Sequence, residues 1–325
     1  SFVDFPATVF NLCGVPIPVH YEGRAFLGPE RGAPRQHVFL YRGRMDERYD
    51  TVRAIRDARF RYVRNYSPHR PWGQHYSYPF QVLPSMRSWF AAFRAGECDP
   101  VQARYWRPKP PEELYDVDSD RFEIRNLAGD LQYAARLAGM RATLRGEMIA
   151  TRDTGFIPEG MFARLVGDET IYDYAQSDAY PIERIVDLAD KASSRDARFL
   201  PDLLAALDDP HPVVRYWGAT GCLILEDRAA PAVPNLKRLL RDDWGDVRIA
   251  AGEALGQLGE IEPSLGTLAE AVNGPNLYES LAALNALEFL WTAGRVSLPR
   301  AQSIVRDLKL GEPADRIPKY LLGAN

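Results

Sequence analysis

The second half of the chain repeats itself, and this repetition restricts the possible fold more than any other feature. The segment PDLLAALDDPHPVVRYWGATGCL at 201–223 is echoed by PNLKRLLRDDWGDVRIAAGEAL at 234–255, at an offset of 33 or 34 residues. A degraded third copy starts at Pro263, with Asn-Gly-Pro at 273–275 in place of the acidic turn. Each copy predicts two helices joined by a turn, and such a pair cannot bury its apolar face alone. The copies must therefore stack into a common core.

These copies resemble HEAT-type repeats over about 100 residues. A Pro-led helix, an Asp-rich turn and a Val-Arg pair that opens the second helix occur twice, at Asp208-Asp209 with Val214-Arg215 and at Asp242-Asp243 with Val247-Arg248. The resemblance leaves two roles open for so short an array. The repeats either bind a partner, including a second copy of this chain in a homo-oligomer, or only buttress the rest of the molecule.

The first half predicts a small antiparallel sheet. Residues 37–42, 51–56 and 59–65 are rich in strand-forming side chains, and Asp57-Ala58 separates the last two runs as a hairpin turn would. From Arg61 to Asn65 apolar and charged residues alternate, so one face of that strand packs and the other meets water or ligand.

Three helices are predicted around this sheet. An amphipathic helix of about a dozen residues ends at Gly14, and a second one spans 84–96, with Pro84 in its first turn and aromatic residues at helical spacing. A third, over 130–150, is expected to lie on the sheet through Leu137, Met140, Leu144 and Met148.

The 325 residues exceed the size at which single cores stop growing, so we expect more than one body. The predicted fold class is α+β. A small antiparallel sheet with packed helices is expected over 1–160, an irregular linker over 161–196, and an all-α array of HEAT-like repeats over 197–325.

Composition excludes several classes of function. A net charge of −4 argues against a general nucleic-acid-binding protein, which needs a basic excess to displace counterions from phosphates. No apolar run reaches the roughly 18 residues of a membrane span, so we expect no membrane insertion. Three widely spaced cysteines indicate neither a disulfide framework nor a zinc site.

Known catalytic motifs are absent from the sequence. It has no glycine-rich phosphate loop, no H-E-x-x-H, no C-x-x-C and no G-x-S-x-G, and its five histidines are scattered. We therefore predict no catalytic residue and no metal ligand within this chain.

The segment 41–76 is the best candidate for a binding site, because charged side chains alternate there with Tyr and Trp. Arginine binds sulfate and carboxylate groups with two parallel hydrogen bonds, and aromatic rings stack on sugars, so this composition suits an anionic sugar. The alternative is a solvated surface whose charges are already satisfied by ion pairs. Composition alone does not decide between them.

Four blocks of the first half, DFPATVFNLCGVPIPVHYEGRAFL, VRAIRDARFRYVRNY, ELYDVDSDRFEIRNLAGD and TRDTGF, follow one another in an order that resembles the carboxyl-terminal subdomain of sulfatases. These enzymes belong to the alkaline-phosphatase-like superfamily. Within it the chain is most similar to sulfamidase, the heparan N-sulfatase. Three features carry this likeness: the Arg-Asp-x-Arg-Phe-Arg hairpin at 56–61, the long Pro- and aromatic-rich insertion after it, and the Glu-Leu-Tyr-Asp block at 113–116. The resemblance spans about residues 1–160.

The resemblance implies that a larger catalytic half lies upstream and carries calcium and a formylglycine made from C/S-x-P-S-R. The nearest string here, Cys98-Asp99-Pro100-Val101-Gln102, lacks the required Ser and Arg. The implied partners are that half and a sulfated carbohydrate, and the implied location is periplasmic or secreted. By residue type and position we predict that the substrate pocket contains Arg44, Asp46, Glu47 and His75, followed by Arg42 and Arg48.

A second hypothesis is a non-catalytic scaffold protein built from a degenerate sulfatase subdomain and the repeats. The two hypotheses differ in the surface that they require. A part of a larger enzyme exposes an apolar face where the rest packs, whereas a free-standing scaffold is polar all round. The candidate apolar residues are Phe2, Phe5, Val9, Phe10 and Leu12.

Overall fold

A computed structural model of the chain describes residues 1–323 and confirms the α+β fold class. The chain forms two compact units. The sheet unit consists of Ser1–Tyr41, Arg53–Arg64 and Glu112–Leu144, and the helical unit consists of Arg42–Val52, Asn65–Pro111 and the chain from Arg145 onward. The sequence predicted a linear division near residues 160 and 196, whereas the chain passes several times from one unit to the other.

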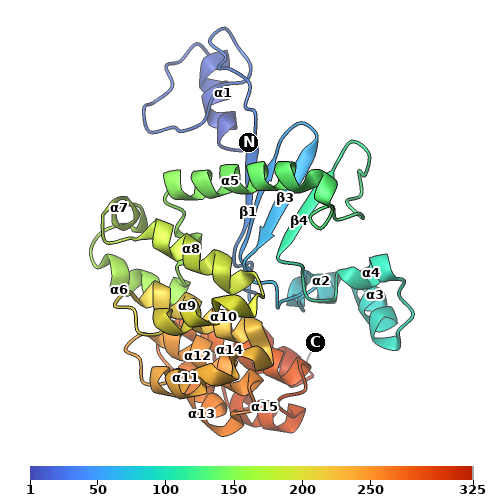
Figure 1. The fold of residues 1–325 in the computed structure, drawn as a ribbon, viewed down its shortest axis with the longest axis vertical. Coiled ribbons are helices and arrows are strands. Elements are labelled where there is room, and N and C mark those ends of the chain that lie inside the picture. Colours follow the sequence, from blue (N-terminus) through green and yellow to red (C-terminus); the bar gives the residue numbers. More distant parts are fainter. Residues whose placement is uncertain (324–325) are drawn as a thin grey trace. The chain divides into compact units, whose positions relative to one another are not determined.

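The sheet unit contains four strands that lie side by side in sequence order (Figure 1): β1 (Val38–Arg42), β2 (Val52–Arg56), β3 (Phe60–Asn65) and β4 (Glu112–Asp116). The first three confirm the predicted strands to within one residue. The fourth was not predicted as a strand, and it pairs antiparallel with β3, with Tyr62 opposite Leu114.

The β2–β3 hairpin turns at Asp57, whose carboxylate accepts hydrogen bonds from the backbone amides of Arg59 at 2.8 Å and Phe60 at 2.6 Å. Helix α5 (Ala134–Ala150) crosses one face of the sheet, as predicted (Figure 1). Its Arg141 forms an ion pair with Glu112 of β4 at 2.7 Å, and Leu137, Met140 and Leu144 on its inner face are buried.

Helix α1 (Asp4–Leu12) ends before Gly14, which has φ +66°. Its inner face is polar, because buried Asp4 receives two hydrogen bonds from Arg35 at 2.6 and 2.8 Å. These hydrogen bonds hold the pKa of Asp4 well below its usual range. Its outer face is apolar and exposed through Phe2, Phe5, Val9 and Leu12.

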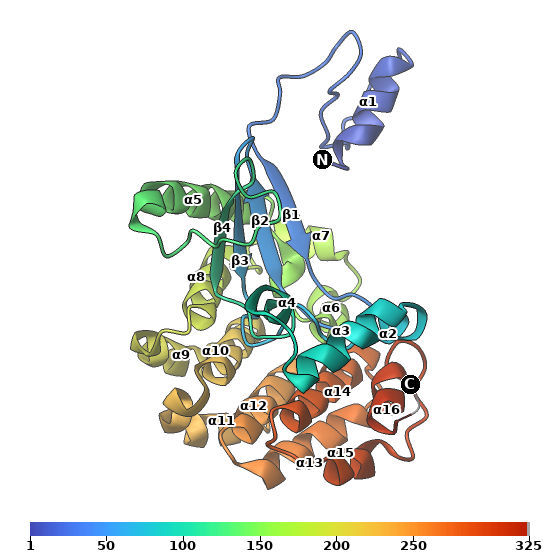
Figure 2. The same ribbon diagram turned by 90° about the vertical axis from the view of Figure 1, so that its right-hand side faces the viewer.

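The helical unit contains the three predicted repeats. They are formed by α9 (Leu200–Ala206) with α10 (Pro212–Leu225), α11 (Val233–Leu239) with α12 (Gly245–Gln257), and α13 (Ile261–Val272) with α14 (Leu277–Thr292). The second helices stack in order, α10 on α12 and α12 on α14, as the yellow-to-red progression in Figures 1 and 2 shows.

The repeated Val-Arg pair has a structural role in this stack. Arg215 donates to the carbonyl oxygen of Asp209, six residues earlier, and Arg248 donates likewise to that of Asp242. Arg215 also forms a two-point ion pair with Asp242 of the next repeat, at 2.7 and 2.9 Å. The same side chain thus closes its own turn and fixes the spacing to the neighbouring repeat.

Further helices of the helical unit extend this core. Helix α8 (Ile182–Ser193) packs on α10, so helical packing begins inside the segment predicted as an irregular linker. The others are α2 (Ser77–Val82), α3 (Pro84–Ala95), α4 (Pro100–Arg104), α6 (Phe162–Val166), α7 (Ile171–Gln176), α15 (Leu298–Val305) and α16 (Arg316–Leu321). Within the described residues no helix is both long enough and apolar enough to cross a bilayer.

Candidate functional site

The predicted binding segment enters the helical unit through a tight turn directly after β1. Met45 and Arg48 exchange two backbone hydrogen bonds of 2.9 Å, and Asp46 between them has φ 47°. Aspartate accepts this left-handed conformation more readily than most residues. The turn therefore presents Arg44, Asp46 and Glu47 close together.

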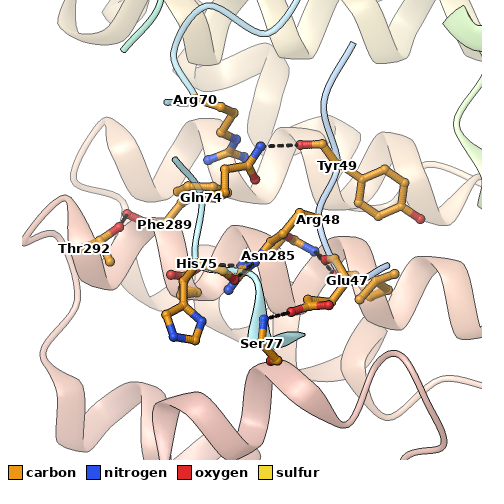
Figure 3. A network of polar contacts seen from close by, with 12 residues as sticks. Glu47, Arg48, Tyr49, Arg70, Gln74, His75, Ser77, Asn285, Phe289 and Thr292 are labelled. Atoms are coloured by element: carbon orange, nitrogen blue, oxygen red, sulfur yellow. Dashed lines mark hydrogen bonds and ion pairs between the residues drawn. The ribbon is translucent and has the colours of Figure 1, made fainter. Parts of the chain in front are cut away.

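Glu47 and Arg48 are buried and hydrogen-bonded inside the helical unit (Figure 3). The carboxylate of Glu47 accepts from the backbone amide of Ser77 at 2.6 Å and from Arg316 at 3.2 Å. The guanidinium of Arg48 donates to the carbonyl oxygen of His75 at 2.6 Å and forms an ion pair with Glu288 of α14. Arg48 thus fixes the turn to the repeats, and Glu47 fixes it to α2 and α16.

The other charged residues of the turn keep part of their surface in contact with solvent. The side chain of Arg44 is 24% exposed, forms an ion pair with Glu159 and donates to the carbonyl oxygen of Asp46 at 2.7 Å. The carboxylate of Asp46 is 44% exposed and lies 3.3 Å from Arg316. Among the predicted residues, these two are well placed to meet a ligand.

Arg42 lies against two aromatic rings. Its guanidinium donates to the hydroxyl of Tyr76 at 2.6 Å and lies 5.4 Å from the ring centre of Trp72. It is also 3.5 Å from Asp50, which is buried with Lys109 in an ion pair of 2.6 Å. A carboxylate therefore lies beside Arg42, Arg44, Arg48 and Lys109, as the hypothesis of internally satisfied charges expects.

His75 stacks on the ring of Tyr320 in α16, with the ring centres 3.6 Å apart and the planes at 14°. Burial and the charge of Arg48 lower the pKa of His75 to about 3. The imidazole is therefore neutral at physiological pH, and it can bind a ligand only by packing or by neutral hydrogen bonds.

His75 also lines a cavity of about 620 Å³ within the helical unit. One wall consists of segment 69–108, which includes α2 and α3, and the other consists of the carboxyl end of α14 with Tyr320 of α16. Seven aromatic rings besides the histidines line it: Phe80, Phe90, Phe93, Trp106, Phe289, Trp291 and Tyr320.

Arg70 is one of the charged residues that line this cavity. Its guanidinium stacks 3.7 Å from the ring centre of Phe289 and forms an ion pair with Glu253 of α12. Figure 3 shows Arg70 and Gln74 beside the backbone of Tyr49, to which Gln74 donates a hydrogen bond of 3.0 Å. The polar network and the cavity thus share residues, because Gln74, His75 and Glu288 belong to the network and also line the cavity.

Sequence reasoning did not find the partners that other parts of the helical unit supply, Glu159, Glu253, Asn285, Glu288 and Arg316. A signal was available for two of them. Asn285 and Glu288 lie one helical turn apart in the otherwise apolar stretch LAALNALEFL, and buried polar residues in such a stretch need partners.

The described residues contain no group of three or more His, Cys, Asp or Glu side chains that could hold a metal ion. The three cysteines are unpaired, and burial raises the pKa of Cys222 to about 12. These residues therefore do not fit the calcium or the formylglycine that the sulfatase resemblance implies for the larger half.

Two comparisons with known proteins bear on this region. A model of HEAT repeats matches residues 188–288, which run from α8 to α14. The chain is also 34% identical, over 160 residues, to a protein of Formosa agariphila described as an "Ulvan-active sulfatase". The match covers 49% of this chain and 27% of that relative, so the chain spans about a quarter of the relative's length.

Proposed function

We propose that this chain is a portion of a sulfatase that hydrolyses sulfate esters or sulfamates of carbohydrates. The observation that carries the proposal is the 34% identity to a sulfatase over half of this chain. The order of the four sequence blocks supports the same family. O–S and N–S cleavage are both included, because the sequence features that resemble sulfamidase do not determine which bond is cut.

In this proposal the chain shapes the substrate pocket and carries no catalytic group. Arg44 and Asp46 are the leading candidates for substrate contact, because their side chains are partly exposed and lie on a tight turn. Arg42 is next, and it combines a guanidinium with the faces of Trp72 and Tyr76. The buried side chains of Glu47 and Arg48 hold the turn in place through their hydrogen bonds. His75 contributes its carbonyl oxygen, which accepts from Arg48.

Sulfuryl transfer, formylglycine and calcium are assigned to the rest of the protein. The exposed apolar residues of α1 support the existence of a further packing partner, since isolated apolar faces of this kind usually mark interaction sites. The location proposed from the family is periplasmic or secreted, and the partners proposed are a sulfated carbohydrate and the catalytic half.

Sulfate release tests this proposal directly. The protein isolated from its native source is expected to exceed the 36.6 kDa of this chain, to contain a formylglycine peptide and to release sulfate from sulfated polysaccharide. The 325-residue chain alone is expected to release none. A native protein of 36.6 kDa without activity or partner would contradict the proposal.

The HEAT repeats favour a second candidate, a non-catalytic scaffold. Such a protein binds another protein or a second copy of itself through the repeats. Sedimentation of the intact chain measures self-association, and sulfate release by the native protein separates this candidate from the first.

A further inference from the structure

The cavity of the helical unit has a lining that sulfate binding does not explain. Its volume of about 620 Å³ lies within the usual range of small-molecule sites. We propose that it binds an uncharged segment of a carbohydrate chain. That the ligand is a carbohydrate rests on the proposed function. That the bound segment is uncharged rests on the residues that line the cavity.

The aromatic rings belong to both walls of the cavity and are held by other rings. On one wall, Phe90 and Phe93 of α3 lie 4.9 and 6.2 Å from Trp106. On the other, Trp291 lies 5.8 Å from Tyr320. Phe90, Phe93, Trp291 and Tyr320 are half-buried. Rigid rings of this kind offer a large contact area at low entropic cost, and sugar rings present flat C–H faces that stack on them.

The charges around the cavity cancel one another. Arg70 is paired with Glu253, and Glu288 is paired with Arg48. Burial lowers the pKa of His69 well below its ordinary value and that of His75 to about 3, so both rings are neutral at pH 7.

The other charged lining residues are Arg94 and Glu226, which are exposed and of opposite sign. A sulfated sugar would gain no net attraction from such a lining and would lose part of its hydration. A neutral sugar avoids this cost.

Polar side chains nevertheless stand at the rim. Thr292 and Gln257 line the cavity together with Arg94 and Glu226, and Thr292 is exposed. Donors and acceptors set around apolar rings suit a ligand that carries hydroxyl groups on its edge and C–H groups on its faces. An entirely apolar ligand would leave these rim groups unused.

Calorimetric titration of the 325-residue chain tests the proposal. The probes are neutral tetrasaccharides of glucan, galactan, mannan and xylan, with a sulfated galactan tetrasaccharide for comparison. At least one neutral probe is expected to bind with a Kd of millimolar or tighter, and the sulfated galactan is expected to bind more weakly than its neutral counterpart.

Three variants locate the binding. Phe93→Ala removes a ring of the wall. Thr292→Trp fills the cavity from an exposed position and gives up the hydrogen bond that the Thr292 hydroxyl donates to the carbonyl oxygen of Phe289 at 3.1 Å. Both are expected to weaken binding at least tenfold. Tyr78→Ala is the matched control in the same wall segment, because it also removes an aromatic ring, is 63% exposed and is not part of the lining. It is expected to bind as the unmodified chain does. If Phe93→Ala fails to fold, the binding measured with Thr292→Trp decides whether the ligand occupies this cavity.

Binding of none of the neutral probes, tighter binding of the sulfated galactan, or unchanged binding by Thr292→Trp would each overturn the inference. Sulfate release by the native protein is a separate measurement. Its absence would remove the proposed function, and the titration would still decide whether the cavity binds neutral sugar.

Discussion

The guanidinium of Arg48 and the carboxylate of Glu288 form an ion pair inside the helical unit, although 240 positions separate them in the sequence. Their side chains are only 1% and 5% exposed. Arg48 also donates to Asn285, whose own amide donates to the carbonyl oxygen of Glu47 at 2.8 Å. One arginine therefore joins the turn after β1 to helix α14.

Removing one member of this pair is expected to destabilise the helical unit strongly. Arg48→Met or Glu288→Leu leaves the other charge buried without its partner, which costs about 3–5 kcal/mol. The double variant is expected to recover much of that loss, because no unpaired charge remains. Urea unfolding followed by circular dichroism gives the three free energies.

The exposed pair of Arg300 and Glu262 is the matched control, at 51% and 74% exposure. Breaking it with Arg300→Met is expected to change the free energy of unfolding by less than about 1 kcal/mol. Equal losses at the buried and the exposed pair would contradict the role assigned to Arg48.

Asp246 is expected to make stability fall as pH rises. It is buried at the start of α12, and burial followed by the nearby Glu279 raises its pKa to about 7 from 3.8. The folded state then binds more protons than the unfolded state between about pH 4 and pH 7, so the free energy of unfolding declines across this window. Above the folded pKa, Asp246 is ionised in both states, so the free energy of unfolding stays lowered and this group no longer makes it change with pH.

Asp246→Asn removes the titrating proton and is expected to flatten that decline by a few kcal/mol. Asp243→Asn, three residues earlier and exposed, controls for the loss of one carboxylate. Denaturant midpoints measured from pH 4 to pH 8 give the comparison. An unchanged slope in Asp246→Asn would show that another group causes the decline.

His75 contributes the opposite pH dependence. Because its folded pKa is lowered to about 3, the unfolded state binds the extra proton first, and stability is lost as pH falls below about 6.5. The ring resonances of His75 in NMR spectra are expected to stay constant from pH 8 to pH 5. A midpoint near pH 6.5 would contradict the buried, stacked position on Tyr320.

Local patterns predicted the elements that depend on local sequence. In these elements the periodicity of apolar residues is visible within a few neighbouring positions. They are strands β1, β2 and β3, helix α3, which is followed by Gly96, and the repeated helix pairs. Strand β4 has only five residues after a Pro-rich stretch, and its pairing with β3 joins segments about 50 positions apart. No local period encodes that pairing, nor the interleaving of the two units.

The candidate site shows the same limit. Charged residues of the turn could be selected by type, but their partners on α14 and α16 lie more than 200 positions away. Burial of Glu47 and Arg48 could not be read from a segment that looks polar throughout. The hypothesis of internally satisfied ion pairs describes those two residues, while Arg44 and Asp46 keep the exposure that ligand binding needs.

Two glycines in the repeats are expected to respond in opposite directions to the same substitution. Gly221 of α10 lies against α9, and a Cβ there would come within 2.5 Å of a Leu203 methyl carbon and 3.0 Å of Ala192 Cβ. Gly266 of α13 is exposed, with no atom within 4 Å of its Cβ position.

Gly221→Ala is therefore expected to lower the free energy of unfolding by about 1–2 kcal/mol through overpacking, in spite of the better helix propensity of alanine. Gly266→Ala meets no neighbour and is expected to raise that free energy by up to about 1 kcal/mol. Thermal unfolding of both variants checks the signs. A stabilising Gly221→Ala would mean that α9 and α10 pack less closely than their contact implies.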